Sequence, residues 1–168
     1  MRRIRLREKV RGTSAMGCEH ISRFNMLEVA LTYGSIDWKD KDVMTRRILI
    51  VDDNQANITH VADFLRFKKF EVEVAYDGEQ AIEKALECGP DVILMDIQMP
   101  GISGFEAIKL LRTNSATAAI KVIAVTARAT QRDKEACLRA GADGYLSKPF
   151  KLAMLDQTLG EMLATASD

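Results

Sequence analysis

Two hydrophobic periods alternate along the chain from residue 46 onward. Short runs such as Ile48–Val51 and Val92–Met95 are apolar throughout, as strands are when a parallel sheet is covered on both faces. Between the runs, apolar side chains recur at helical spacing, as they do at Ile58, Val61 and Leu65. The alternation therefore predicts five repeats of a strand followed by a helix.

The segments between these runs suggest where each element begins and ends. Residues 70–74 alternate apolar and charged positions, which indicates an edge strand with one wet face. Asn54 is a suitable N-cap for the first helix, and Asp77-Gly78 is interpreted as a turn. An apolar stripe from Ala81 to Leu86 predicts the second helix, which ends at Gly89-Pro90. The remaining predicted elements are strands at 48–51, 92–95, 122–125 and 142–146, and helices after Gly104, over 131–140 and over 150–163.

This order of elements predicts an α/β fold, with a doubly wound five-stranded parallel sheet and helices on both faces. Residues 70–74 form the least hydrophobic strand, so an edge position suits them and the strand order becomes 2-1-3-4-5. Sheets of this kind bind ligands beyond the carboxyl ends of the strands, where the strand order reverses. Here the reversal falls between the first and third strands.

Polar side chains follow four of the predicted strands, at the edge where ligands bind. The first strand runs into two carboxylates and the third into another, while a hydroxyl and an ammonium end the fourth and fifth: Asp52, Asp53, Asp96, Thr126 and Lys148. Carboxylates in one pocket repel each other unless a cation joins them. Mg²⁺ suits such an oxygen site and also accepts phosphate oxygens. Asp52 and Asp53 are the expected ligands, with the backbone carbonyl of Gln98 adding an oxygen.

Asp96 is the candidate nucleophile, because it ends the central strand and Gly101 and Gly104 open the loop behind it. Carboxylates do form acyl phosphates. Lys148 can supply positive charge to the transferring oxygens, and Thr126 can donate a hydrogen bond. No histidine lies at these strand ends and the chain has no glycine-rich phosphate loop. The residue types therefore suit acceptance of a phosphoryl group, and not a kinase or phosphatase that turns over an outside substrate.

At these positions the chain resembles the response-regulator receiver domain of two-component signalling. The resemblance covers Thr45 to about Leu163, and its motifs fall in the family's order and at its spacing. The motifs are Ile48-Leu49-Ile50-Val51-Asp52-Asp53-Asn54, Leu94-Met95-Asp96-Ile97-Gln98-Met99-Pro100-Gly101-Ile102-Ser103-Gly104, Val125-Thr126-Ala127 and Lys148-Pro149.

The resemblance implies a function and a set of roles. Asp96 would take a phosphoryl group from a phosphohistidine on a sensor histidine kinase or a histidine phosphotransfer protein. Tyr145 matches the family's aromatic switch position, and Lys148-Pro149 is expected to be a cis peptide. Mg²⁺ and the phosphoryl oxygens would be held by two sets of residues: Asp52, Asp53, Asp96 and the carbonyl of Gln98 for the metal, and Thr126 and Lys148 for the oxygens. When Thr126 closes on the phosphoryl group, Tyr145 would turn inward and change a protein-binding face.

Two rival functions remain beside this one. The domain could bind partners constitutively, as a receiver-like module that needs no phosphorylation. An aspartyl phosphatase of the haloacid-dehalogenase type is disfavoured, because that family has Asp-x-Asp after the first strand and this chain has Asp52-Asp53-Asn54. Dinucleotide binding is disfavoured because the chain has no GxGxxG motif.

Composition and charge indicate which partners and which cellular compartment to expect. The 168 residues carry 24 basic and 24 acidic side chains, so net charge favours no nucleic-acid partner, and no apolar run is long enough to span a membrane. Three scattered cysteines fit a reducing cytoplasm. Residues 1–44 do not join the alternation and are expected to be an N-terminal extension, either disordered or an amphipathic helix through Ile21, Phe24, Leu27 and Leu31, whereas 45–168 form the receiver domain. Because the chain ends at Asp168, its output is expected to be a contact with a downstream protein or onward transfer of phosphate.

Overall fold

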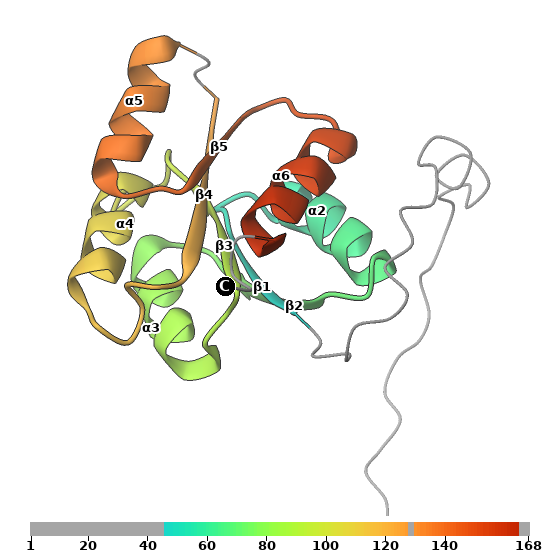
Figure 1. Cartoon of the computed structure of the whole chain (residues 1–168), viewed down its shortest axis with the longest axis horizontal. Helices are drawn as coiled ribbons and strands as arrows, with labels where there is room; N and C mark the ends of the chain where they lie inside the picture. Colours follow the sequence, from blue (N-terminus) through green and yellow to red (C-terminus); the bar gives the residue numbers. More distant parts are fainter. Residues whose placement is uncertain (1–45, 128–129, 165–168) are drawn as a thin grey trace, which may run out of the picture. The chain divides into compact units, whose positions relative to one another are not determined.

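A computed structural model describes residues 46–127 and 130–164 of the chain (Figure 1). All of them belong to one compact unit, Asp40–Asp168. The predicted extension at 1–44, with its amphipathic pattern, lies outside the described residues. The division of the chain at residue 45 therefore stays a prediction.

Five parallel strands form one sheet in the order β2-β1-β3-β4-β5. This order confirms the predicted topology and places the half-exposed strand at an edge. Each strand is within two residues of its predicted position, and the bounds are β1 (Arg47–Val51), β2 (Glu71–Ala75), β3 (Val92–Asp96), β4 (Lys121–Thr126) and β5 (Gly144–Ser147).

Helices cover both faces of the sheet, as Figure 1 shows: α2 and α6 pack on one face, and α3, α4 and α5 on the other. Their bounds are α2 (Gln55–Phe67), α3 (Gly78–Cys88), α4 (Gly104–Thr113), α5 (Gln131–Ala140) and α6 (Leu152–Ala164). Among the described residues, no helix combines the length and the hydrophobicity that a membrane crossing requires.

The strands divide their side chains between two hydrophobic clusters, one on each face of the sheet. In β1, Leu49 and Val51 join the cluster beneath α3, α4 and α5, whereas Ile48 and Ile50 join the cluster beneath α2 and α6. All four side chains are at most 4% exposed. Strands that are apolar on both faces thus form the middle layer of three, and this rigid layer carries the polar strand ends.

The helix caps agree with the sequence except at the start of α3. Asn54 caps α2 as predicted, with its side-chain oxygen accepting from the N–H of Ala56 at 2.9 Å. The interpretation of Asp77-Gly78 as a turn is wrong, because Asp77 is the N-cap of α3 and Gly78 its first residue. A Cβ at Gly78 would lie 2.6 Å from the carbonyl oxygen of Ile102, so the glycine allows the helix to begin against the loop after β3.

The apolar stripe of α3 is narrower than predicted. Ala81 and Ala85 are buried, but Leu86 is 48% exposed. Small alanine side chains let the helix lie close to the sheet, and this close packing buries only a narrow face of the helix. Leu86 therefore lies outside the core.

Candidate functional site

Two neighbouring strands bring the acidic residues together at the carboxyl edge of the sheet. Val51 and Met95 are partners in the β1–β3 register, so the residues after them, Asp52 and Asp96, leave the sheet side by side. One carboxylate oxygen from each of Asp52, Asp53 and Asp96 lies within 4.8 Å of the other two. The convergence that the strand order predicted is present in the structure.

The three carboxylates differ in their exposure to solvent. Asp52 and Asp96 are each 5% exposed, whereas Asp53 is an exposed residue. Thr126, at the end of β4, is 3% exposed. The cluster therefore combines two buried carboxylates with one that is exposed to solvent.

Lys148 connects the two buried carboxylates. Its Nζ lies 2.6 Å from Oδ2 of Asp52 and 2.6 Å from Oδ2 of Asp96. The backbone N–H of Lys148 donates to the carbonyl of Thr126 at 2.7 Å, and the Lys148–Pro149 peptide bond is cis. The lysine is thus tied to the end of β4 through its backbone and to β1 and β3 through its side chain.

Burial and pairing shift the pKa values of this pair in the same direction. Burial raises the pKa of Asp96 above its usual value, although hydrogen bonds from Lys148 and from the N–H of Gln98 oppose the shift. Burial alone would lower the pKa of Lys148, but its hydrogen bonds to Asp52 and Asp96 raise it overall. Lys148 is therefore cationic at neutral pH, and the charged form of Asp96 is disfavoured by burial more than its hydrogen bonds favour it.

The loop after β3 holds Asp96 from behind. The N–H of Gln98 donates to Oδ1 of Asp96 at 2.9 Å. A Cβ at Gly104 would lie 2.1 Å from the carbonyl oxygen of Asp96, so only glycine lets α4 begin so close to this strand end. Ser103 and Glu106 form a capping box that fixes the first turn of α4. The predicted acceptor thus sits on a closely packed strand, loop and helix.

Asn57 is a site residue that the sequence patterns did not single out. It lies in the first turn of α2, three residues after the N-cap Asn54. Its side-chain Nδ2 is 3.2 Å from both carboxylate oxygens of Asp52. The signal available in the sequence was weak, because a polar residue in the first turn of a helix is ordinary.

Tyr145 lies on β5, which pairs with β4. The residue is half-buried and packs against the cluster beneath α3, α4 and α5. Burial raises the pKa of its hydroxyl, and the neighbouring Cys137 and Asp133 raise it further. In the β4–β5 register Tyr145 is opposite Ala124, two residues before Thr126, so the two candidate switch residues lie on adjacent strands, two register positions apart.

The donor set fits Mg²⁺. Three carboxylate oxygens within reach of one cation are hard ligands, and Lys148 is the one ammonium that ion-pairs with them among the residues described. Asp52, Asp53 and Asp96 can therefore hold a small divalent ion, and Gln98 lies two residues after Asp96 in the loop that follows β3.

Comparison with known proteins agrees with this geometry. A family model described as the response regulator receiver domain matches residues 48–160. The polar-differentiation response regulator DivK of Brucella ovis is 37% identical over 123 residues, which cover 73% of this chain and 100% of the relative. The same regulator from Brucella anthropi is 36% identical over 123 residues, with the same coverage.

Solved structures show the same fold. The chemotaxis protein CheY4 of Vibrio cholerae is similar with a TM-score of 0.67 and 33% identity, covering 70% of this chain and 98% of that one. The receiver domain of a sensor histidine kinase from Pseudomonas aeruginosa, with a magnesium ion coordinated in its active site cleft, has a TM-score of 0.66 and 38% identity. That match covers 71% of this chain and 98% of that receiver domain.

The chain belongs to the response regulator receiver domain family. It is a phosphoryl-accepting receiver of two-component signalling, with the parallel five-stranded fold of its CheY-like neighbours. Members of the family interact with histidine kinases and with downstream targets, and receiver domains are generally not enzymes.

Proposed function

We propose that Asp96 is the phosphoryl acceptor of this receiver, and that Mg²⁺ binds at Asp52, Asp53, Asp96 and the carbonyl of Gln98. The observation that carries the proposal is the meeting of three carboxylates at one sheet edge, with Lys148 2.6 Å from Oδ2 of Asp96. The donor is a phosphohistidine on a sensor histidine kinase or a histidine phosphotransfer protein.

The transfer requires no base on this chain. An oxygen of Asp96 attacks the phosphorus, the new O–P bond forms as the partner's N–P bond breaks, and the histidine nitrogen keeps the electron pair. Bound Mg²⁺ supplies positive charge against the carboxylates and the transferring oxygens. Lys148 turns from Asp96 to a phosphoryl oxygen, and Thr126 donates its hydroxyl to another. Water later hydrolyses the acyl phosphate, so the receiver catalyses both the gain and the loss of the phosphoryl group on its own Asp96.

The modified state is signalled through Thr126 and Tyr145. When Thr126 moves toward the phosphoryl group, the space at the end of β4 changes and Tyr145 turns inward on β5. The half-buried position of Tyr145 beside α5 supports this step, because a ring at the rim of the core has both an inner and an outer place to pack. The face made by α5, β5 and α6 then binds a downstream protein differently.

Incubation with Mg²⁺ and acetyl phosphate tests the acceptor. We expect intact-mass spectrometry to show the gain of one phosphoryl group, and we expect that gain to be lost in Asp96→Asn. Asp91→Asn is the matched control, since Asp91 precedes the same strand at its opposite end and should leave the gain intact. No gain in the unmodified chain would overturn the proposal and favour the constitutive binding module.

Two further expectations accompany this function. We propose a cytoplasmic location, which the free thiols of Cys88 and Cys137 support. We also propose that the receiver domain starts near residue 45, so a chain that begins at Met44 should fold and accept phosphate normally. Reduced stability or phosphorylation of that shorter chain would contradict the proposed boundary.

A further inference from the structure

Three different groups donate hydrogen bonds to the carboxylate of Asp52: a backbone N–H, a lysine ammonium and a side-chain amide. Its Oδ1 accepts from the backbone N–H of Asn54 at 2.8 Å, and its Oδ2 accepts from Lys148 at 2.6 Å. The side-chain amide of Asn57 lies 3.2 Å from both oxygens, on the side of α2. The carboxylate is thus held between α2 and the residue that follows β5.

The two side-chain donors differ in what happens to them during the proposed reaction. Lys148 is shared between Asp52 and Asp96, and it leaves both when it turns to a phosphoryl oxygen. Asn57 contacts Asp52 from the first turn of a regular helix whose N-cap is satisfied, so it has no reason to move. After Lys148 leaves, the Asn57 amide is the remaining side-chain donor to Asp52 in the hydrogen bonds described.

The residue type also suits a neighbour of a cation. A neutral amide orients a carboxylate without adding positive charge, whereas a lysine or arginine at this position would repel Mg²⁺. Groups that hydrogen-bond to metal ligands fix ligand orientation, and their loss typically weakens metal binding by about 10- to 100-fold. Asn57 is exposed, so its contribution to the hydrophobic core is small.

We propose that Asn57 is a positioning residue of the receiver site, which holds the carboxylate of Asp52 in the orientation that binds Mg²⁺, both before and after Lys148 turns to the phosphoryl group. This inference rests on the proposed function, since it assumes that Asp52 takes part in binding the metal. Asn57 itself touches neither the phosphoryl group nor the cation.

Isothermal titration with Mg²⁺ alone tests the inference. We expect the dissociation constant of Asn57→Ala to rise about tenfold. Gln55→Ala is the matched control, because Gln55 is an exposed amide in the same helical turn whose side chain bonds to Thr59 at 3.4 Å, and it should bind Mg²⁺ as the wild type does. The thermal midpoint of Asn57→Ala without metal should stay close to that of the wild type.

The outcomes separate this inference from the proposed function. Unchanged Mg²⁺ affinity in Asn57→Ala, beside normal binding by the wild type, would overturn the role of Asn57 alone. Equal weakening in Asn57→Ala and Gln55→Ala would also overturn it, because the effect would then belong to the helical turn. A wild type that binds no Mg²⁺ would overturn the proposed function and this inference with it. Asn57→Gln, which keeps the amide, should recover part of the affinity.

Discussion

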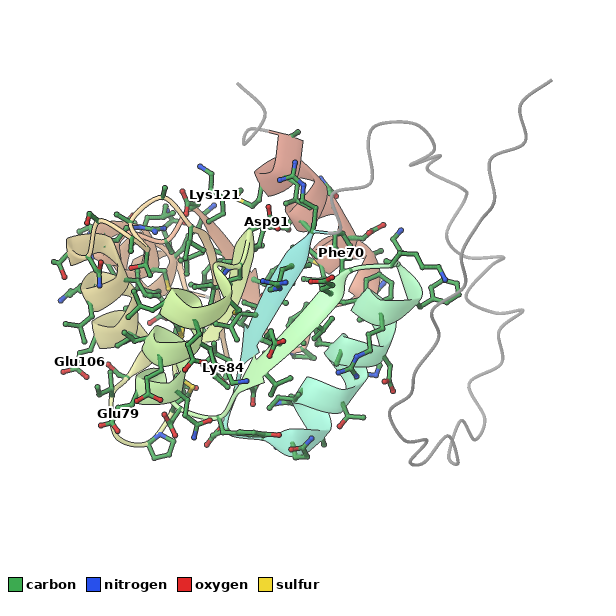
Figure 2. All side chains as sticks on the ribbon, turned by 90° about the horizontal axis from the view of Figure 1, so that it is seen from below. Phe70, Glu79, Lys84, Asp91, Glu106 and Lys121 are labelled. Atoms are coloured by element: carbon green, nitrogen blue, oxygen red, sulfur yellow. The ribbon has the colours of Figure 1, made fainter. Side chains whose placement is uncertain are left out.

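The two edges of the sheet carry charge in different ways. At the amino edge, where the strands begin, described cations are paired with carboxylates: Arg46 lies 2.8 Å from Asp91, and Arg112 lies 2.6 Å from Asp143. At the carboxyl edge, Lys148 is the one cation that ion-pairs with the acidic cluster within residues 46–127 and 130–164. Figure 2 shows Asp91 and Lys121 near each other at one end of the sheet, away from Glu79 and Glu106 at the starts of α3 and α4.

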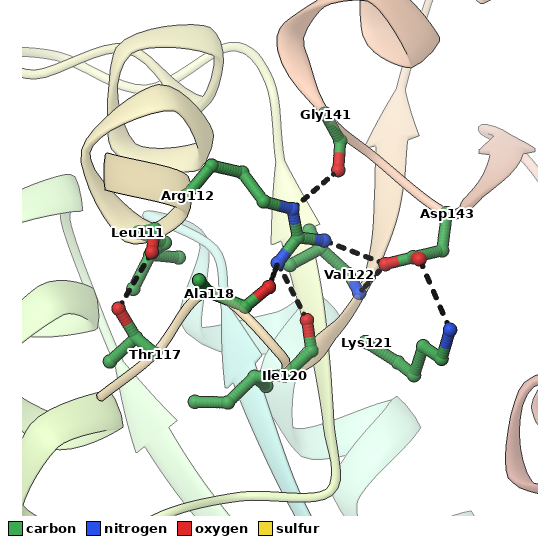
Figure 3. A network of polar contacts seen from close by, with 9 residues as sticks. All are labelled: Leu111, Arg112, Thr117, Ala118, Ile120, Lys121, Val122, Gly141 and Asp143. Atoms are coloured by element: carbon green, nitrogen blue, oxygen red, sulfur yellow. Dashed lines mark hydrogen bonds and ion pairs between the residues drawn. The ribbon is translucent and has the colours of Figure 1, made fainter. Parts of the chain in front are cut away.

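Hydrogen bonds and ion pairs at the amino edge join neighbouring elements of the fold. Figure 3 shows Arg112, at the end of α4, donating to the carbonyls of Gly141, Ala118 and Ile120 and to Asp143. Asp143 in turn accepts from the backbone N–H of Val122 at 2.9 Å. One arginine and one aspartate thereby join α4, the start of β4 and the segment between α5 and β5.

The contrast separates charges that are paired between elements from carboxylates that share one pocket. Paired, hydrogen-bonded charges between elements stabilise the native state or cost little. Unbalanced carboxylates that share a pocket destabilise it, and they persist where a ligand of opposite charge is expected. Substitutions at the two edges should therefore change stability in opposite directions.

The largest expected effect on stability is at the amino edge. Asp143→Ala removes the side-chain acceptor of the Val122 N–H and one of the four acceptors of Arg112, so the free energy of unfolding should fall by about 2–3 kcal/mol in urea denaturation. Glu71→Ala is the control on the same edge: its pair with Arg47 is more exposed, and the loss of stability should be clearly smaller. Equal losses would show that the Asp143 network stabilises the fold no more than an exposed ion pair does.

Metal should change stability through the carboxyl edge only. Mg²⁺ at ten times its dissociation constant should raise the free energy of unfolding by about 1.4 kcal/mol, and a chelator should remove the gain. Asp53→Asn should abolish the gain, whereas Asp143→Ala should keep it in full, although from a lower starting stability. A gain that survives Asp53→Asn would place the ion elsewhere.

Without metal, neutralising the acceptor should stabilise the fold. Burial raises the pKa of Asp96, which means that its charged form is disfavoured in the folded chain. Asp96→Asn should therefore raise the free energy of unfolding. Asp91→Asn, which weakens the pair with Arg46, should lower it. A loss of stability in both variants would remove the contrast between the edges.

The smallest expected effect is a dependence on pH. Because the pKa of Asp96 is raised above 3.8, the folded chain binds this proton more strongly than the unfolded chain does. The cost of its charge is fully present above the folded pKa and disappears as the pH falls through that value. The stability deficit of the wild type relative to Asp96→Asn should thus shrink between pH 7 and pH 4 in metal-free urea denaturation. A deficit independent of pH would contradict the assignment to Asp96.

The sequence predicted elements better than it predicted contacts between them. Periodicity found each described strand and helix, and the weak hydrophobicity of residues 70–74 was enough to place β2 at the edge. The predictions of a turn at Gly78 and of a buried Leu86 were wrong. Both depend on how closely α3 approaches its neighbours. Hydrophobic spacing reports which side of an element is buried, and it contains no measure of that distance.

The sequence by itself determined that this chain is a doubly wound α/β domain, with Asp52, Asp53 and Asp96 at one edge, because strand periodicity and strand order suffice to bring strand ends together. Only the tertiary structure decided that Lys148 bridges two of these carboxylates and that Asn57 supports one of them. Those contacts join α2, β1, β3 and the segment after β5. The packing of helices on the sheet sets the separations between these elements. Side-chain hydrogen bonds form only within a few tenths of an ångström of the right distance, so hydrophobic spacing along the chain cannot predict them.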